Sequence, residues 1–181
     1  MYIEKKLIGE TVALKSVEMD DAEFILNIRN NEKISKFLPK LKISLEDQKK
    51  WINKQRSDRD SYYFIVEDIQ NEKKLGTISV YDIVGNHGET GRFCSIGNFI
   101  QNTEAIVLLY DFVFYDLLLD YVTIWVYKEN KPVIAMNTQI GFEWTEQVKA
   151  DDGRDTCVGI LRPERYENKI RAIRKSFTKM N

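Results

Sequence analysis

The feature that most constrains this chain is its longest apolar stretch, which runs from Ala105 to Leu119 and is interrupted only by Asp111 and Asp116. A helix that crosses a bilayer needs roughly 20 apolar residues, so this stretch is too short to span a membrane. A helix that is apolar nearly all round must be buried within the protein. We therefore expect a helix at the centre of a soluble fold.

Patterns typical of strands and helices flank this stretch on both sides. Alternating and β-branched runs predict strands at 11–17, 62–66, 75–84, 92–100, 121–127, 142–148 and 156–161, with a turn cluster at 85–91. Helical spacing and end signals predict helices at 22–30, from Ser44, at 103–120, at 130–140 and from Glu164. The order predicts an α/β fold with a single mixed, mainly antiparallel sheet flanked by helices, plus a C-terminal helix.

Composition excludes several classes of function. The chain has 27 basic and 28 acidic residues, a balance that argues against a surface-wide nucleic-acid footprint. One histidine and two distant cysteines cannot form a His/Cys zinc site, so we expect no metal. No glycine-rich dinucleotide or Walker motif is present. The polar start and the two cysteines predict a cytoplasmic protein with reduced thiols, no signal peptide and no membrane partner.

We expect one domain over 1–163, with 164–181 as a basic amphipathic helix of the same domain. This tail has six basic and two acidic residues. Its apolar positions, Tyr166, Ile170, Ile173 and Phe177, have helical spacing. Such a helix could dock on the domain, pair two subunits as a homodimer, or contact a polyanion such as RNA. The apolar positions favour docking or pairing over nucleic-acid contact.

The most specific pattern lies in 126–142, where a strand, Glu129-Asn130, a helix and Gly141-Phe142 follow one another. Supporting pieces are Gly76-Thr-Ile-Ser, Ile96-Gly-Asn-Phe-Ile and Ile28-Arg-Asn. On these residues the chain resembles the GCN5-related N-acetyltransferase (GNAT) superfamily. Its style is most similar to ribosomal-protein N-terminal acetyltransferases and amino-sugar-nucleotide N-acetyltransferases. The resemblance implies direct acetyl transfer from acetyl-CoA to a primary amine on a small molecule or a peptide.

The resemblance also implies where the coenzyme lies. The family's Q/R-x-x-G-x-G/A run for the pyrophosphate corresponds here to 100–105, which has no glycine. A helix N-terminus still attracts anions through its free N–H groups and dipole, whereas Glu104 brings a like charge. Simple helix capping by Asn102 or Thr103 is the alternative. The predicted coenzyme-binding residues are Phe99, Ile100, Gln101, Asn102, Thr103, Glu104, Ala105, Asn130 and Asn137.

Three of the implied roles are more specific. Asn130 would bond the pantetheine arm, cap the following helix, or do both. Asn137 stands where the family often has a tyrosine that protonates the leaving thiolate. Backbone N–H groups of the strand at 95–100 would stabilise the thioester oxygen, and Gly97 would mark a bulge that opens the coenzyme slot, or simply be a glycine in a crowded strand.

For the catalytic base the sequence offers Asp82 and His87. Histidine suits proton transfer near neutral pH, but a turn cap for Asp82, a solvated loop for His87, and a water chain are alternatives. The predicted acceptor-binding residues are Arg29, Asn30, Trp51 and Tyr81. Arginine suits a phosphate or carboxylate, and aromatic rings can stack on a sugar or base. A helix-end arginine and a core tryptophan are the structural alternatives.

Two other functions remain open at this point. The glycine-free run and Asn137 fit a catalytically impaired GNAT-fold module that acts in binding or regulation. The basic tail fits an RNA- or ribosome-associated protein.

Overall fold

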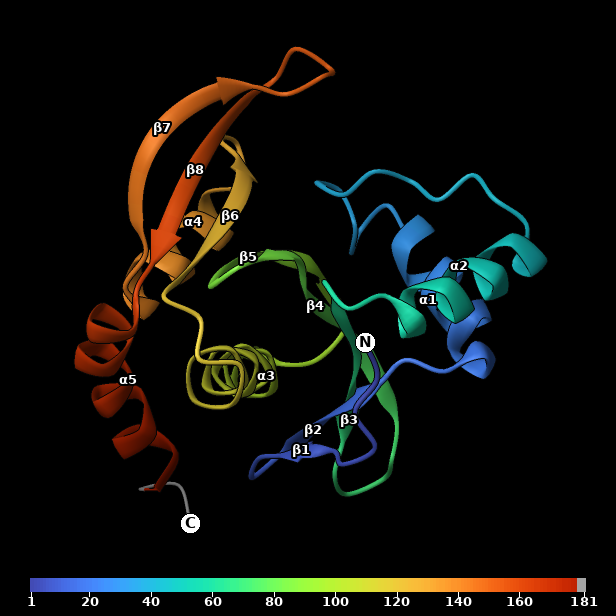
Figure 1. Cartoon of the computed structure of the whole chain (residues 1–181), viewed down its shortest axis with the longest axis horizontal. Helices are drawn as coiled ribbons and strands as arrows, with labels where there is room; N and C mark the ends of the chain where they lie inside the picture. The colour runs from blue at the N-terminus through green and yellow to red at the C-terminus, as the bar shows by residue number, and fades with distance from the viewer. Residues whose placement is uncertain (179–181) are drawn as a thin grey trace.

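Eight strands form one continuous sheet in the order β1-β2-β3-β4-β5-β6-β8-β7 (Figure 1). This computed structural model describes the backbone of residues 1–178 and the side chains of residues 1–170. The strands are β1 Leu7–Ile8, β2 Val12–Ser16, β3 Tyr62–Asp68, β4 Lys74–Val84, β5 His87–Ser95, β6 Tyr121–Tyr127, β7 Glu143–Lys149 and β8 Asp155–Leu161. The helices are η1 Met19–Asp21, α1 Ala22–Asn30, α2 Leu45–Ser57, α3 Phe99–Asp111, the π-helix η2 Phe112–Asp116, α4 Lys131–Ile140 and α5 Pro163–Thr178.

The pairing of the strands confirms the predicted fold class. Strands β1 to β5 are antiparallel neighbours, and β8 pairs antiparallel with both β6 and β7. The one parallel pair joins β5 to β6, the two strands on either side of α3 in the chain. The fold is thus α/β, with a mixed, mainly antiparallel sheet and a C-terminal helix.

The predicted strand at 92–100 is wrong at both ends. Strand β5 begins at His87, because the turn before it takes only Gly85 and Asn86, and Gly85 adopts a φ of +57°. The strand ends at Ser95, and α3 begins at Phe99 instead of Thr103. Asn98 and Gln101 form a capping box there, with each side chain bonding the other residue's backbone N–H at 3.0 Å.

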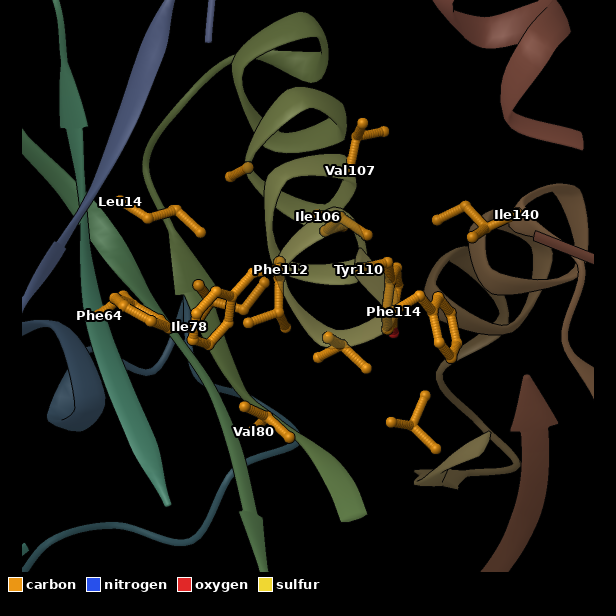
Figure 2. Packing of buried hydrophobic residues seen from close by; sticks show 14 of the residues in the cluster. Leu14, Phe64, Ile78, Val80, Ile106, Val107, Tyr110, Phe112, Phe114 and Ile140 are labelled. Atoms are coloured by element: carbon orange, nitrogen blue, oxygen red, sulfur yellow. The ribbon is translucent and has the colours of Figure 1, made fainter. Parts of the chain in front are cut away.

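The two faces of the sheet are covered by different helices (Figure 1). Helix α3 packs on one face, where Figure 2 shows Leu14, Phe64 and Ile78 pointing toward Ile106 and Phe112. Helices α1 and α2 cover the other face of β3 with a second, smaller apolar cluster. We call this second side the α1–α2 face.

The sequence predicts one α-helix from Thr103 to Asp120. In the structure, α3 ends at Asp111 and the chain does not continue as an α-helix. It widens into the π-helix η2, whose Phe112, Val113 and Phe114 are all buried. The ring centroid of Phe112 lies 5.0 Å from that of Tyr62, edge to face.

Helix α5 docks on the domain through the predicted apolar positions that the structure describes. Tyr166 and Ile170 are fully buried. The Tyr166 hydroxyl lies 3.1 Å from the carbonyl oxygen of Val107 and 2.8 Å from Asp111 Oδ1, which joins α5 to α3. The side chains of Ile173 and Phe177 lie outside the described residues.

Candidate active site

Strands β5 and β6 pair only at their beginnings and then diverge. His87, Gly88 and Glu89 lie opposite residues 121–123, and β5 continues to Ser95 without a further recorded partner on β6. The strands β6, β8 and β7 form a separate wing in Figure 1. A narrow cavity of about 40 Å³ lies at this divergence. It is lined by Ile78, Thr90, Gly91, Phe93, Ile106, Leu109, Tyr110, Ile124, Val133, Met136 and Asn137.

A β-bulge in β5 lies beside this cavity. Thr77 faces Cys94 and Ser79 faces Gly91, so two residues of β5 stand opposite one residue of β4. Arg92, one of these two, has a φ of +53°. The bulge predicted at Gly97 therefore lies earlier in the chain. Gly97 follows the end of β5, where an added Cβ would lie 2.9 Å from Asn102 Oδ1.

Glu89, which the sequence analysis did not single out, lies at the last paired position before the strands diverge. Its carboxylate accepts a hydrogen bond from the hydroxyl of Tyr81. Burial raises the pKa of Glu89, the Tyr81 hydrogen bond lowers it, Asp82 raises it and Arg92 lowers it, with a net rise. A carboxyl group with a raised pKa, next in the chain to Thr90 of the cavity lining, is a candidate for proton transfer. The sequence pattern predicts a turn at 85–91, and for this reason it does not indicate that Glu89 lies on a strand.

Arg92 lies among aromatic rings on the α1–α2 face. Its Cζ atom lies 4.1 Å from the ring centroid of Tyr81 and 5.4 Å from that of Trp51. The Trp51 ring meets Tyr63 edge to face at 5.7 Å. The Nη1 atom of Arg92 is buried without a hydrogen-bond partner. The structure thus brings two predicted acceptor residues, Trp51 and Tyr81, to an arginine that the sequence analysis missed.

The other two predicted acceptor residues lie at the end of α1. Arg29 is only 7% exposed; its Nη2 donates to the carbonyl oxygen of Pro39 at 3.0 Å, and its Nε has no partner. It lines a cavity of about 340 Å³ between α1 and the loop that follows. Asn30 instead holds that loop, because its side chain exchanges two hydrogen bonds with the backbone of Leu41 at 2.9 and 3.1 Å.

The predicted coenzyme-binding residues 99–105 fall into two groups, and the first group lies in the first turn of α3. The N–H groups of Phe99 and Ile100 lie in that turn and have no acceptor within the helix. Gln101 caps the helix and also donates to Asp68 at 2.8 Å. Asn102 donates to the carbonyl oxygen of Gly97 at 2.9 Å, and its buried Oδ1 has no partner. Asn102 therefore lies inside the helix and is not its N-cap.

The remaining part of that run makes contacts within the protein. The Thr103 hydroxyl donates to the carbonyl oxygen of Phe99 at 2.8 Å, and Ala105 is fully buried in the core. Glu104 is 5% exposed and accepts hydrogen bonds from the backbone between β1 and β2. The polar side chains of Thr103 and Glu104 bond within the protein, and the coenzyme-binding role of all three residues stays a prediction. The like charge of Glu104 is likewise directed away from the helix N-terminus.

The two asparagines near α4 occupy different environments. Asn130 precedes α4, and its side chain makes no capping hydrogen bond. Asn137 is 2% exposed, lines the cavity between β5 and β6, and donates to the carbonyl oxygen of Val133 at 2.8 Å. The structure therefore places Asn137 beside the predicted slot.

The two predicted catalytic residues flank Glu89 at a distance from the cavity lining. Asp82 is exposed, with a φ of +50° where β4 loses register with β5. His87 belongs to β5 and not to a loop, and its ring stacks on Tyr121 with centroids 5.1 Å apart. The roles assigned to both stay predictions.

Two kinds of site are absent from the part of the chain that the structure describes. It contains no group of three or more His, Cys, Asp or Glu side chains that could hold a metal ion. No helix there is long and apolar enough to cross a membrane.

Comparison with known proteins gives a consistent family. The family described as "Acetyltransferase (GNAT) domain" matches residues 12–143. No curated protein matches the chain. Among solved structures, the chain is similar to apo FdhC, described as a nucleotide-linked sugar GNAT, with 26% identity and a TM-score of 0.79 over 95% of this chain and 98% of the other.

Two further structures share the fold. The spermidine N-acetyltransferase of Vibrio cholerae in complex with CoA and spermine is 20% identical, with a TM-score of 0.77 over 87% of this chain and 99% of the other. A GCN5-related N-acetyltransferase from Brucella melitensis is 19% identical, with a TM-score of 0.74 over 91% and 81%.

Proposed function

The chain belongs to the GNAT acetyltransferase family, and on that premise we propose that it transfers an acetyl group from acetyl-CoA to a primary amine by direct attack. The observation that carries the proposal is the divergence of β5 and β6, with Glu89 at the last paired position and an apolar cavity beyond it. The cavity suits the narrow thioester arm of the donor. The α1–α2 face suits entry of the amine from the other side.

The residues around the slot fit the donor in two ways. The N–H groups of Phe99 and Ile100 at the start of α3 suit the pyrophosphate, because a helix N-terminus attracts anions without requiring glycine. The buried, unpartnered Oδ1 of Asn102 offers an acceptor in the same turn. Asn130 precedes α4 with a side chain free of capping bonds, which suits an amide of the pantetheine arm.

On the acceptor side, Glu89 takes the proton that the amine must lose. The amine nitrogen then forms a bond to the carbonyl carbon of the thioester, and the C–S bond breaks to release the CoA thiolate. We assign stabilisation of the carbonyl oxygen to backbone N–H groups at the bulge of Arg92 and Phe93, because such donors stabilise developing negative charge. The raised pKa of Glu89 suits this role, since a base works best when its pKa approaches the working pH.

The leaving group needs little help from an acid. Asn137 has no ionisable proton, and its side-chain amide already donates to the carbonyl oxygen of Val133. A thiol has a pKa of about 8.5, so it leaves as a thiolate near neutral pH far more readily than an alcohol would. The replacement of the family's tyrosine by Asn137 is therefore compatible with turnover.

A thiol-release assay with acetyl-CoA and a panel of amines tests the proposal. The wild-type chain should release CoA only when an acceptor amine is present. Glu89→Gln should lower kcat by about 10²- to 10⁴-fold, the usual contribution of a general base. Release that is independent of every amine, or an unchanged kcat in Glu89→Gln, would contradict the mechanism.

Matched variants separate the three candidates for the base. Glu146→Gln makes the same change at an exposed position on β7, remote from the slot, and should retain full activity. Asp82→Asn and His87→Asn test the two residues predicted from sequence. If Asp82→Asn or His87→Asn removes the acidic limb of the pH profile while Glu89→Gln keeps it, the base is the residue changed in that variant and not Glu89.

Three other expectations continue as proposals. We expect the protein to be cytoplasmic and 164–181 to fold with the rest of the domain, with a homodimer as the alternative role for this tail. Cell fractionation, proteolysis and size-exclusion chromatography would check them in that order.

A further inference from the structure

Two arginines on the α1–α2 face hold buried N–H groups that nothing satisfies. In the part of the chain with described side chains, the buried side-chain polar atoms without a partner are Arg29 Nε, Arg92 Nη1 and Asn102 Oδ1. Buried donors are nearly always hydrogen-bonded in folded proteins, so each exception calls for an explanation. A ligand that accepts hydrogen bonds from both guanidinium groups would supply one.

The two guanidinium groups lie near the same side chain. Arg92 Cζ is 6.0 Å from the ring centroid of Tyr63. Burial raises the pKa of the Tyr63 hydroxyl, the hydrogen bond with Thr77 lowers it, and the positive charges of Arg29 and Arg92 lower it further. Arg29 also lines the 340 Å³ cavity together with Lys36, Lys40 and Glu32, and Glu32 pairs with Lys40, which leaves a net positive lining. Space and positive charge therefore occur together at this end of the face.

Negative charge lies on the same face, next to Arg92. Glu89 marks the point where β5 and β6 diverge, and Asp82 is close enough to raise its pKa. Arg92 follows Glu89 by three positions along β5, across the bulge, and both side chains contact Tyr81: the guanidinium lies 4.1 Å from its ring centroid and the Glu89 carboxylate accepts its hydroxyl hydrogen bond. An arriving ammonium group would meet the carboxylates, and the remainder of the molecule would extend toward the arginines.

The loop between α1 and α2 closes over this arrangement. It leaves α1 beside Arg29 and reaches toward the β6 wing in Figure 1, where the ring centroids of Phe37 and Tyr127 are 6.4 Å apart. The Arg29–Pro39 hydrogen bond and the Asn30–Leu41 pair hold the loop at its other end. The loop therefore has fixed contacts both at α1 and at β6.

We propose that the acceptor is an amine that also carries an anionic group, a phosphate or a carboxylate, and that Arg92 and Arg29 bind this group. The inference rests on the proposed acetyl transfer and names the class of its acceptor. A polyamine fits poorly, because its second ammonium would face the two guanidinium groups. A guanidinium group matches the planar or tetrahedral oxygens of either anion through paired N–H donors.

Paired acceptors that differ only in the anion test the proposal by kinetics. The first pair is glucosamine 6-phosphate and glucosamine. The second is a nucleotide-linked amino sugar and the free amino sugar, and the third is a tripeptide with a free C-terminal carboxylate and the same tripeptide with a C-terminal amide. Spermidine is the polycationic comparison. Hydrogen bonds to a charged group predict a kcat/KM higher by about 10- to 100-fold for the anionic member of at least one pair. The pair that shows the preference distinguishes phosphate from carboxylate.

Variants then locate the preference. Arg92→Gln should bring the ratio of kcat/KM within that pair close to one. Arg92 is half-exposed, and glutamine at this position would adopt the same positive φ as arginine, so Arg92→Gln should fold. Arg29 is buried, so a substitution there is less well tolerated. Arg29→Lys keeps the charge and removes the Nε donor. Arg59→Gln, at an exposed position, is the control and should leave the ratio unchanged.

Three kinetic results would overturn the proposal. They are a kcat/KM for spermidine above that of every anionic amine, equal values within all pairs, and a preference that survives in Arg92→Gln.

A binding measurement keeps this inference separate from the catalytic one. Glucosamine 6-phosphate, inorganic pyrophosphate and glucosamine are titrated against the wild-type chain and the variants by thermal shift, with and without saturating CoA. Stabilisation by the phosphorylated probes that is lost in Arg92→Gln supports the anion site even if no amine is acetylated, in which case only the proposed transfer fails. Stabilisation that persists in Arg92→Gln, or none at all, rejects the site.

Discussion

Glu104→Gln tests a buried contact that joins α3 to the turn between β1 and β2. The carboxylate accepts hydrogen bonds from the backbone N–H groups of Glu10 at 2.5 Å, Thr11 at 2.7 Å and Val12 at 3.0 Å. It also accepts one from the Thr11 hydroxyl at 2.6 Å. Every partner is a donor, so the site requires two acceptor oxygens.

The amide of glutamine supplies one acceptor and one donor. Oε2 of Glu104 accepts three of the four bonds and Oε1 accepts the one from Glu10, so the best orientation keeps three bonds and leaves Glu10 facing an NH₂ group. The three remaining bonds also lose the contribution of the charge, about 1 kcal/mol each. Water can reach Glu10, which is exposed, and limits the cost there. We expect a loss of about 3–5 kcal/mol in the free energy of unfolding.

Urea unfolding followed by circular dichroism measures this loss. Glu146→Gln, the same change at an exposed position, should alter the free energy of unfolding by less than about 0.5 kcal/mol. Gly9→Ala provides a second perturbation of the contact, because its Cβ would lie 2.6 Å from Glu104 Cδ. The effects of Gly9→Ala and Glu104→Gln should therefore be less than additive in the double variant.

The same variant distinguishes a structural role from coenzyme binding. Since the carboxylate is directed at the β1–β2 turn, the folded variant should keep the wild-type KM for acetyl-CoA. A raised KM with a stability loss below about 1 kcal/mol would refute the reasoning.

Three further predictions concern the site and the packing. Tyr81→Phe removes the hydrogen bond that lowers the pKa of Glu89, so the acidic limb of kcat/KM against pH should move to higher pH; an unmoved limb contradicts the assignment of Glu89. Gly76→Ala would place a Cβ 2.2 Å from the carbonyl oxygen of Cys94, and thermal unfolding should show a loss of at least about 2 kcal/mol. Tyr166→Phe leaves two oxygens on α3 without its hydroxyl and should cost about 1–2 kcal/mol in urea unfolding, with a value near zero counting against this link.

Features that depend on neighbours in the chain could be predicted from the sequence. The helix N-cap at Ser44, whose side chain accepts the N–H of Asp47 at 3.1 Å, follows from a pattern of four residues. The block from the end of β6 through α4 to Gly141 is equally local, and Gly141 adopts the predicted left-handed end of the helix, with a φ of +120°. Because such preferences act over one or two turns, the order of strands and helices was evident.

The tertiary structure alone decided which side chains meet. Glu104 contacts residues more than ninety positions earlier in the chain, and its sequence neighbours do not reveal this contact. The bulge at Arg92 arises from the register between β4 and β5, and it brings Arg92 between Tyr81 and Trp51. The sequence by itself therefore determined the elements and the family. The environment of Glu89 and the two unsatisfied arginines came from long-range pairing, which no local pattern specifies.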